Sequence, residues 1–174
     1  TRAFFAAVRQ LKQDGLISAK TLRIVLRATA ADAVYALLLQ QAGIDDIVQL
    51  APSIPYRDAL REMLTADGLL LFQASMCNHQ IPAKLYEYLR AGRPILALTD
   101  PAGDTAQALR TSDSGTICTL TDSEDIARQL RAFVDAIRQG QAQGTSLEAA
   151  SLHSRRARTA ELAALLDQVS ASRG

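Results

Sequence analysis

Two short, uninterrupted apolar runs constrain the fold of this chain more than any other feature of its sequence. They occupy Leu69–Phe72 and residues 94–99, and each is flanked by segments with helical periodicity. A continuous apolar run suits a strand buried on both faces of a parallel sheet, because helices then cover both faces. The sequence therefore predicts an α/β fold built on a parallel sheet.

Strand-like and helical segments alternate along the rest of the chain. Further strands are expected at 22–28, 47–50 and 116–120, with helices at about 4–15, 29–43, 57–65, 83–91, 104–112 and 122–137 and a last helix after 145. This alternation predicts a Rossmann-like, doubly wound parallel sheet with helices on both faces. Residues 1–144 would form this domain, and 145–174 a helical extension.

Polar residues at the expected helix starts predict the caps. The expected caps are Thr29, Asp104 or Thr105, Asp122, and a Thr145–Glu148 capping box.

Apolar residues recur at helical spacing in three of the expected helices. The second helix carries Val34, Leu37 and Leu38, the third is expected to point Leu60 with Met63 or Leu64 inward, and the last carries an apolar stripe at Leu162, Leu165, Leu166 and Val169. The last helix is expected to pack on this domain or to reach beyond it.

Charge and cysteine usage exclude some classes of function. The 174 residues carry 19 Lys and Arg against 18 Asp and Glu, a balance that excludes a broad nucleic-acid footprint. No apolar run is long enough to span a bilayer, and no signal peptide is visible. Cys77 and Cys118 stand apart and are expected to be reduced thiols rather than metal ligands. Because it begins at Thr1, the chain is interpreted as a fragment of a longer protein.

Loops at the carboxyl ends of two strands hold the candidate ligand-binding residues. In open parallel sheets, ligands bind at this edge. Ser75, Asn78 and His79 follow one strand, and the segment from Gly103 through Asp104 to Thr105 follows the next. These residues could bind phosphate or sugar, but ordinary loop composition and a plain helix cap would supply them too.

The segment 81–97 carries the most informative chemistry. Pro82 opens a helix, whose free N–H groups and partial positive charge favour a phosphate. Lys84 lies in the first turn, and Glu87 follows one turn later. This combination suits a nucleotide, because the cation and the N–H groups can bind phosphate and the carboxylate can accept hydrogen bonds from ribose hydroxyls. The alternative is a solvated Lys–Glu pair on an ordinary helix.

This segment resembles the donor-binding segment of GT-B glycosyltransferases of the family-4 type. Those enzymes carry an E-x7-E motif that ends in a pattern like Glu-Ala-x-Ala-x-Gly-x-Pro, and Glu87, Gly92 and Pro94 stand at its Glu, Gly and Pro. The resemblance continues through Gly103 and Gly115 to the helix after Asp122, and so covers most of the chain.

The resemblance implies specific roles. Glu87 would bind the ribose of the donor, a nucleotide-diphosphate sugar such as a UDP- or GDP-sugar. His79 stands where the family's first Glu contacts the transferred sugar. No Asp-x-Asp motif is present, so the departing diphosphate would be stabilised without a metal or other cofactor. No catalytic base is assigned, because the family places that residue in an N-terminal acceptor-binding domain.

The same resemblance implies a biological setting. The whole enzyme would transfer the sugar with retention to an acceptor glycan or lipid-linked saccharide. It would act in polysaccharide or glycoconjugate synthesis, in the cytoplasm or at the inner face of the membrane. Two alternatives stay open: a nucleotide-sugar epimerase, which uses the same fold, and a non-catalytic interaction module.

The usual strand order of such a sheet implies one more feature. The first strand lies between the second and the fourth, here 22–28 and 69–72, and no segment of this chain supplies it. The structure is therefore expected to show a gap or a substitute strand there.

Overall fold

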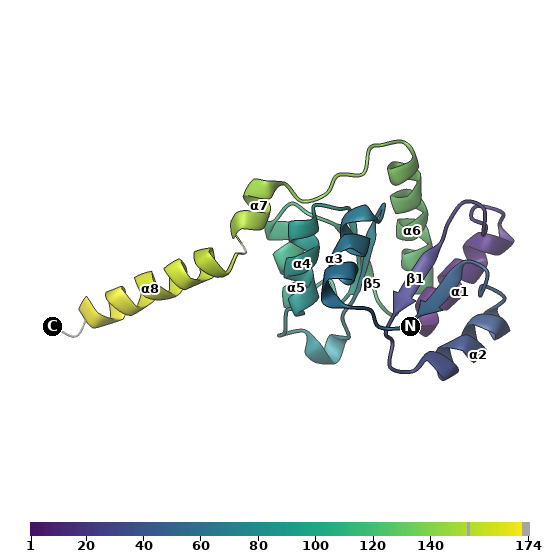
Figure 1. The fold of residues 1–174 in the computed structure, drawn as a ribbon, viewed down its shortest axis with the longest axis horizontal. Coiled ribbons are helices and arrows are strands. Elements are labelled where there is room, and N and C mark those ends of the chain that lie inside the picture. Colours follow the sequence, from purple (N-terminus) through teal and green to yellow (C-terminus); the bar gives the residue numbers. More distant parts are fainter. Residues whose placement is uncertain (153, 172–174) are drawn as a thin grey trace.

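The computed structural model describes residues 1–152 and 154–171, and His153, expected on a solvated helix face, lies outside them. Figure 1 shows strands enclosed by helices, with the C-terminal helix extending away. The elements are α1 (Arg2–Gln13), β1 (Ile24–Arg27), α2 (Asp32–Ala42), β2 (Val48–Ala51), α3 (Tyr56–Thr65), β3 (Leu69–Phe72), a 3-10 turn (Ser75–Cys77), α4 (Ala83–Ala91), β4 (Ile95–Thr99), α5 (Asp104–Thr111), β5 (Thr116–Thr119), α6 (Ser123–Arg138), α7 (Leu147–Leu152) and α8 (Arg155–Ala171).

The strands form two parallel sheets. β1 pairs with β2, and β4 lies between β3 and β5. This confirms the α/β class with parallel strands and is compatible with a Rossmann-like fold. Within the described residues no strand joins β1 to β3, so the sheet is interrupted at the expected place.

Helices cover both sides of the strands, as Figure 1 shows. On one side, α1, α2 and α6 enclose the larger apolar core, to which both sheets contribute. On the other side, α4 and α5 pack on β3 and β4 through a smaller core that includes Leu71, Leu85, Leu89 and Leu109. β4 is buried along its whole length, as its apolar run predicts.

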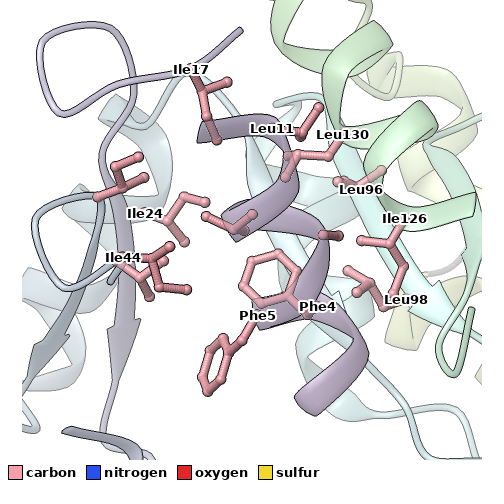
Figure 2. Close-up of a cluster of buried hydrophobic side chains, with 14 of the residues drawn as sticks. Phe4, Phe5, Leu11, Ile17, Ile24, Ile44, Leu96, Leu98, Ile126 and Leu130 are labelled. Carbon is pink, nitrogen blue, oxygen red and sulfur yellow. The ribbon is translucent and has the colours of Figure 1, made fainter. Parts of the chain in front are cut away.

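Helix α1 joins the two sheets. Its adjacent Phe4 and Phe5 point to different halves of the molecule. The Phe4 ring lies edge-on to Phe72 of β3, with 5.3 Å between centroids, and the Phe5 ring lies edge-on to Tyr35 of α2 at 6.0 Å. Figure 2 shows α1 between Ile24 and Ile44 on one side and Leu96, Leu98 and Ile126 on the other. The two sheets are therefore held together across the gap by a shared helix.

Only part of the apolar set expected in α2 faces the core. Leu38 packs on the core, as does Tyr35, and Leu39 is buried, whereas Val34 and Leu37 are 58% and 59% exposed. The helix is apolar around most of its circumference, so spacing alone could not select the inward side. In α3, no residue is fully buried, and Leu64, one of the two alternatives for its inward face, is exposed.

Burial of β3 is also less complete than predicted. Leu69 and Leu71 are buried, but Leu70 and Phe72 are only partly so, because this strand borders the gap.

The predicted caps of α2 and α5 are also wrong. Ala31 rather than Thr29 is the cap of α2, although the Thr29 hydroxyl accepts a bond from the Ala31 N–H. Gly103 precedes α5, so Asp104 is its first residue, and Thr105 lies inside it. Asp122 caps α6 as predicted, accepting from the N–H groups of Glu124 and Asp125.

The C-terminal region differs from the expected single helix. It forms α7 and α8, and the Ser146 hydroxyl, not Thr145, accepts from the N–H of Ala149 at the start of α7. α7 packs on α4. α8 reaches beyond the body in Figure 1, and the stripe at Leu162, Leu165, Leu166 and Val169 is exposed.

Candidate functional site

The predicted site lies at the carboxyl edge of the β3–β4–β5 sheet. Here the segment 73–82 leads from β3 to α4, and the segment 100–103 leads from β4 to α5. The helices that follow therefore begin at this edge. A shallow groove of about 460 Å³ lies elsewhere, between α1 and α2, and is lined by Arg2, Arg9 and Gln41 among others. It contains none of the predicted site residues.

The loop after β3 is held in place by its own first residue. The side-chain amide of Gln73 donates to the carbonyl oxygens of Cys77, at 3.0 Å, and of Gln80, at 2.9 Å. The buried hydroxyl of Thr105 in α5 also donates to the Gln80 carbonyl, at 3.4 Å. Thr105 therefore fixes the loop rather than facing solvent.

Asn78 fastens the same loop to the start of α5. The side-chain amide of Asn78 donates to Asp100 Oδ2 over 2.6 Å, and the main-chain carbonyl oxygen of Asn78 accepts from the Asp104 N–H over 2.9 Å. The Ala102 N–H also donates to Asp100, at 2.9 Å. These bonds, first from Ala102 and then from Asn78, lower the pKa of Asp100. Asp100 therefore stays ionised as an acceptor.

Gly103 allows the two loops to approach closely. A β-carbon at this position would lie 3.1 Å from Asn78 Oδ1 and 3.3 Å from the Asp100 carbonyl. Four predicted site residues are thus brought together as a fastening between the loops. They are Asn78, Gly103, Asp104 and Thr105.

The second set of predicted residues lies at the start of α4. Pro82 is the N-cap of α4, and buried Leu85 and Leu89 anchor the helix, which leaves Lys84 exposed in its first turn. Glu87 follows Lys84 by three positions and therefore lies on the same face. This face presents an ammonium group and a carboxylate beside a helix N-terminus.

Tyr56 is a site residue that sequence analysis missed. It begins α3, and its hydroxyl donates to Glu87 Oε1 over 3.3 Å. The bond orients the Glu87 carboxylate across 31 positions of sequence. Only the fact that α3 also starts at the carboxyl edge could have indicated this approach.

Ser75 and His79 are exposed on the loop after β3, as is Met76, which is 90% exposed. The structure places these side chains at the same edge as α4 but shows no fastening role for them among the described hydrogen bonds.

At the end of β1, Arg27 forms an ion pair with Glu62 of α3. Arg27 donates through Nε and Nη2 to the two carboxylate oxygens of Glu62, each over 2.6 Å, and through Nη1 to the Pro52 carbonyl over 2.6 Å. This fork-shaped pairing connects β1 to α3 and lowers the pKa of Glu62.

Comparison with known proteins gives no further identification. The sequence matches no protein-family model and no curated protein. Among residues 1–152 and 154–171, no three potential ligands gather as a metal site. No helix within those same residues has the length and apolar character needed to cross a membrane.

Proposed function

We propose that this chain is the donor-binding part of a GT-B glycosyltransferase of the family-4 type. Its ligand would be a nucleotide-diphosphate sugar, transferred with retention to a glycan or lipid-linked acceptor bound by another domain. The proposal rests on one observation above all. In the segment that resembles the donor motif, exposed Lys84 and half-buried Glu87 share one face of α4, which begins at the carboxyl edge of a parallel sheet.

The chemistry of that face suits a nucleotide diphosphate. The N-terminus of α4 offers N–H groups and a partial positive charge, and Lys84 adds a full charge. Glu87 cannot attract a diphosphate, but its oxygens can accept hydrogen bonds from both ribose hydroxyls. The Tyr56 bond holds one oxygen in position and so reduces the ordering cost of binding.

The loop fastening supports the same assignment. A site for a charged donor needs a fixed loop, and the bonds of Gln73, Asn78 and Thr105 fix the segment 73–80 beside α4. Ser75 and His79 then project from a rigid support, where they can contact phosphate or sugar.

Calorimetric titration with UDP, GDP and the corresponding nucleosides tests the proposal. Glu87→Gln should weaken nucleotide binding by on the order of 1.5–3 kcal/mol, because a charged hydrogen bond to ribose is lost. Lys84→Ala should weaken diphosphate binding more than nucleoside binding.

Two substitutions distant from α4's start serve as matched controls. Glu148→Gln changes an exposed carboxylate on α7, and Lys20→Ala removes an exposed ammonium before β1. Both should leave affinity unchanged. Absence of binding by the unmodified protein to either nucleotide would favour the interaction-module alternative, and equal losses from Glu87→Gln and Glu148→Gln would refute the role of Glu87.

A further inference from the structure

Helices α1 and α2 border a groove that the proposed function does not use. The two helices lie beside each other (Figure 1), and the Phe5 ring of α1 meets the Tyr35 ring of α2 edge-on. The groove of about 460 Å³ between them continues into a second hollow of about 410 Å³ that reaches Gly43. The two hollows share Arg9, Gln13, Gln41 and Ala42, so they form one groove along the helices.

Apolar side chains line the inside of this groove. Phe5 and Ala6 come from α1, and Leu38 and Ala42 come from α2. The methyl groups of the two alanines are too short to fill the space between the helices, so the apolar surface stays open. A hollow of this kind suits the apolar stripe of another helix.

The apolar surface continues over the outside of α2. Val34 precedes the groove residue Leu38 by four positions. Leu37 precedes the groove residue Gln41 by the same interval. Residues four apart share a helix face, so Val34 and Leu37 lie on the side of α2 that borders the groove. Both are more than half exposed, and a partner that covered them would remove apolar surface from water.

The α1 wall of the groove is positively charged. Arg2 and Arg9 line it, are exposed, and form no ion pair in the part of the chain that the structure describes. Helix α1 contains no Asp or Glu. The one acidic residue of α2, Asp32, lies two positions before Val34 and therefore on the opposite side of that helix.

Two carboxylates at the far end of the groove already have partners. Asp14 accepts from the side-chain amide of Gln10 over 3.0 Å, and Asp46 accepts from the Lys12 ammonium over 2.7 Å. Neither of them pairs with Arg2 or Arg9. The groove therefore keeps two guanidinium charges that are free to bind carboxylates of another molecule.

The spacing of Arg2 and Arg9 defines the charge pattern of a complementary helix. Seven positions make about two turns, or about 10.5 Å along α1. A helix that lies along the groove matches this interval when its own acidic residues are also seven positions apart. A flat anionic membrane is a poorer match, because it cannot enter the hollow between two helices.

We propose that the groove between α1 and α2 is the docking site for an acidic amphipathic helix of a partner protein. The apolar stripe of that helix would cover Leu37 and Leu38, and its carboxylates would pair with Arg2 and Arg9. The groove lies on the opposite side of the strands from α4, so this inference does not depend on the proposed sugar transfer.

Two labelled helical peptides of identical composition test the site with the whole 174-residue chain. Both are alanine-based, about 18 residues long, with leucines at steps of three and four. One carries a pair of glutamates seven positions apart beside the leucine stripe, and the other carries the pair on the opposite face. Fluorescence anisotropy should show that the first binds about 10-fold more tightly, because two ion pairs form only with it.

Variants at exposed positions locate the binding surface. Arg9→Glu should abolish the preference between the peptides, whereas Arg156→Glu, on α8, should preserve it. Leu37→Gln should weaken binding of both peptides by about 5-fold or more, whereas Leu147→Gln, on α7, should not. Because all four side chains are exposed, the melting temperature should stay unchanged.

Three results would overturn the proposal. The first is equal affinity for the two peptides, or a preference that survives Arg9→Glu. The second is binding to vesicles of equal parts phosphatidylcholine and phosphatidylserine that Arg9→Glu abolishes, without peptide binding, since the groove would then serve a lipid surface. The third is a dimer of the unmodified chain that Leu37→Gln dissociates, because a second copy would then occupy the groove.

Discussion

Gly144 is the position at which a single methyl group should detach the C-terminal region. This glycine lies in the connector between α6 and α7, where the chain crosses the end of α4. A β-carbon at Gly144 would lie 1.8 Å from the Gly92 carbonyl oxygen and 2.4 Å from the Gly92 carbonyl carbon. Ordinary contact begins at 3.4 Å, so the connector must move by about 1.6 Å. Both partners are main chain, and no side-chain rotation can relieve the overlap.

The expected cost of Gly144→Ala is set by what the movement releases. Thr145 and Ala150 are buried beside α4 in the present structure, and lifting the connector exposes both. The loss should be about 1–3 kcal/mol of unfolding free energy. For a chain of this size, it corresponds to a fall in melting temperature of about 2–12 °C. The structure of the two sheets should not change.

Hydrogen exchange measured by mass spectrometry locates the effect. Gly144→Ala should accelerate exchange in α7, where the Ala150 N–H donates to Ser146 over 2.9 Å. Gly140→Ala is the matched control, because Gly140 has a φ of 67° but open space around its α-carbon. It should cost about 1 kcal/mol through backbone strain without loosening α7. Unchanged α7 exchange in Gly144→Ala, or equal acceleration in both variants, would refute the steric argument.

Two further predictions concern titrating groups. Burial, with a smaller contribution from Asp125, raises the pKa of the Cys118 thiol to about 12. A disulfide reagent at pH 8 should therefore react with Cys118 at least about 1000-fold more slowly than with Cys77. Comparable reaction rates at the two thiols would contradict the burial of Cys118. The hydrogen bonds from Arg27 lower the pKa of Glu62 below its ordinary 4.5, so the pair stabilises the fold above that pH and the benefit is lost as the pH falls below it. Glu62→Gln should therefore reduce stability at pH 7 and flatten its decline in acid, and an unchanged acid-unfolding profile would exclude this coupling.

Sequence patterns predicted the order of elements well because each strand is short, apolar and followed by a helix with its own stop signal. Gly92 illustrates this: it ends α4 in the left-handed conformation, with a φ of 64°. Orientation was harder to predict for α2, since Val34, Leu37 and Leu39 are equally apolar and only tertiary contacts select Leu39 as the buried one.

The candidate site also has a part that local sequence predicts and a part that only tertiary contacts decide. Pro82, Lys84 and Glu87 lie within six consecutive residues, so their placement at the start of α4 followed from local spacing. The hydrogen-bond partners of Glu87 and Asn78 could not be predicted from local spacing. Tyr56 and Asp100 meet them from other strand–helix units, 31 and 22 positions away, and only the assembled sheet edge brings these residues together.

The position of α1 has a consequence for the order of events during synthesis. Phe4 leaves the ribosome more than a hundred residues before Ile126 and Leu130 of α6, which share its core. At about 5–20 residues per second, that delay lasts from about 6 to about 24 s. Through that time the apolar face of α1, with Phe4, Phe5 and Val8, has no α6 to pack on, which makes it a natural target for a chaperone that binds nascent chains. The part of the core that α1 shares with α6 can therefore form only after α6 has been synthesised.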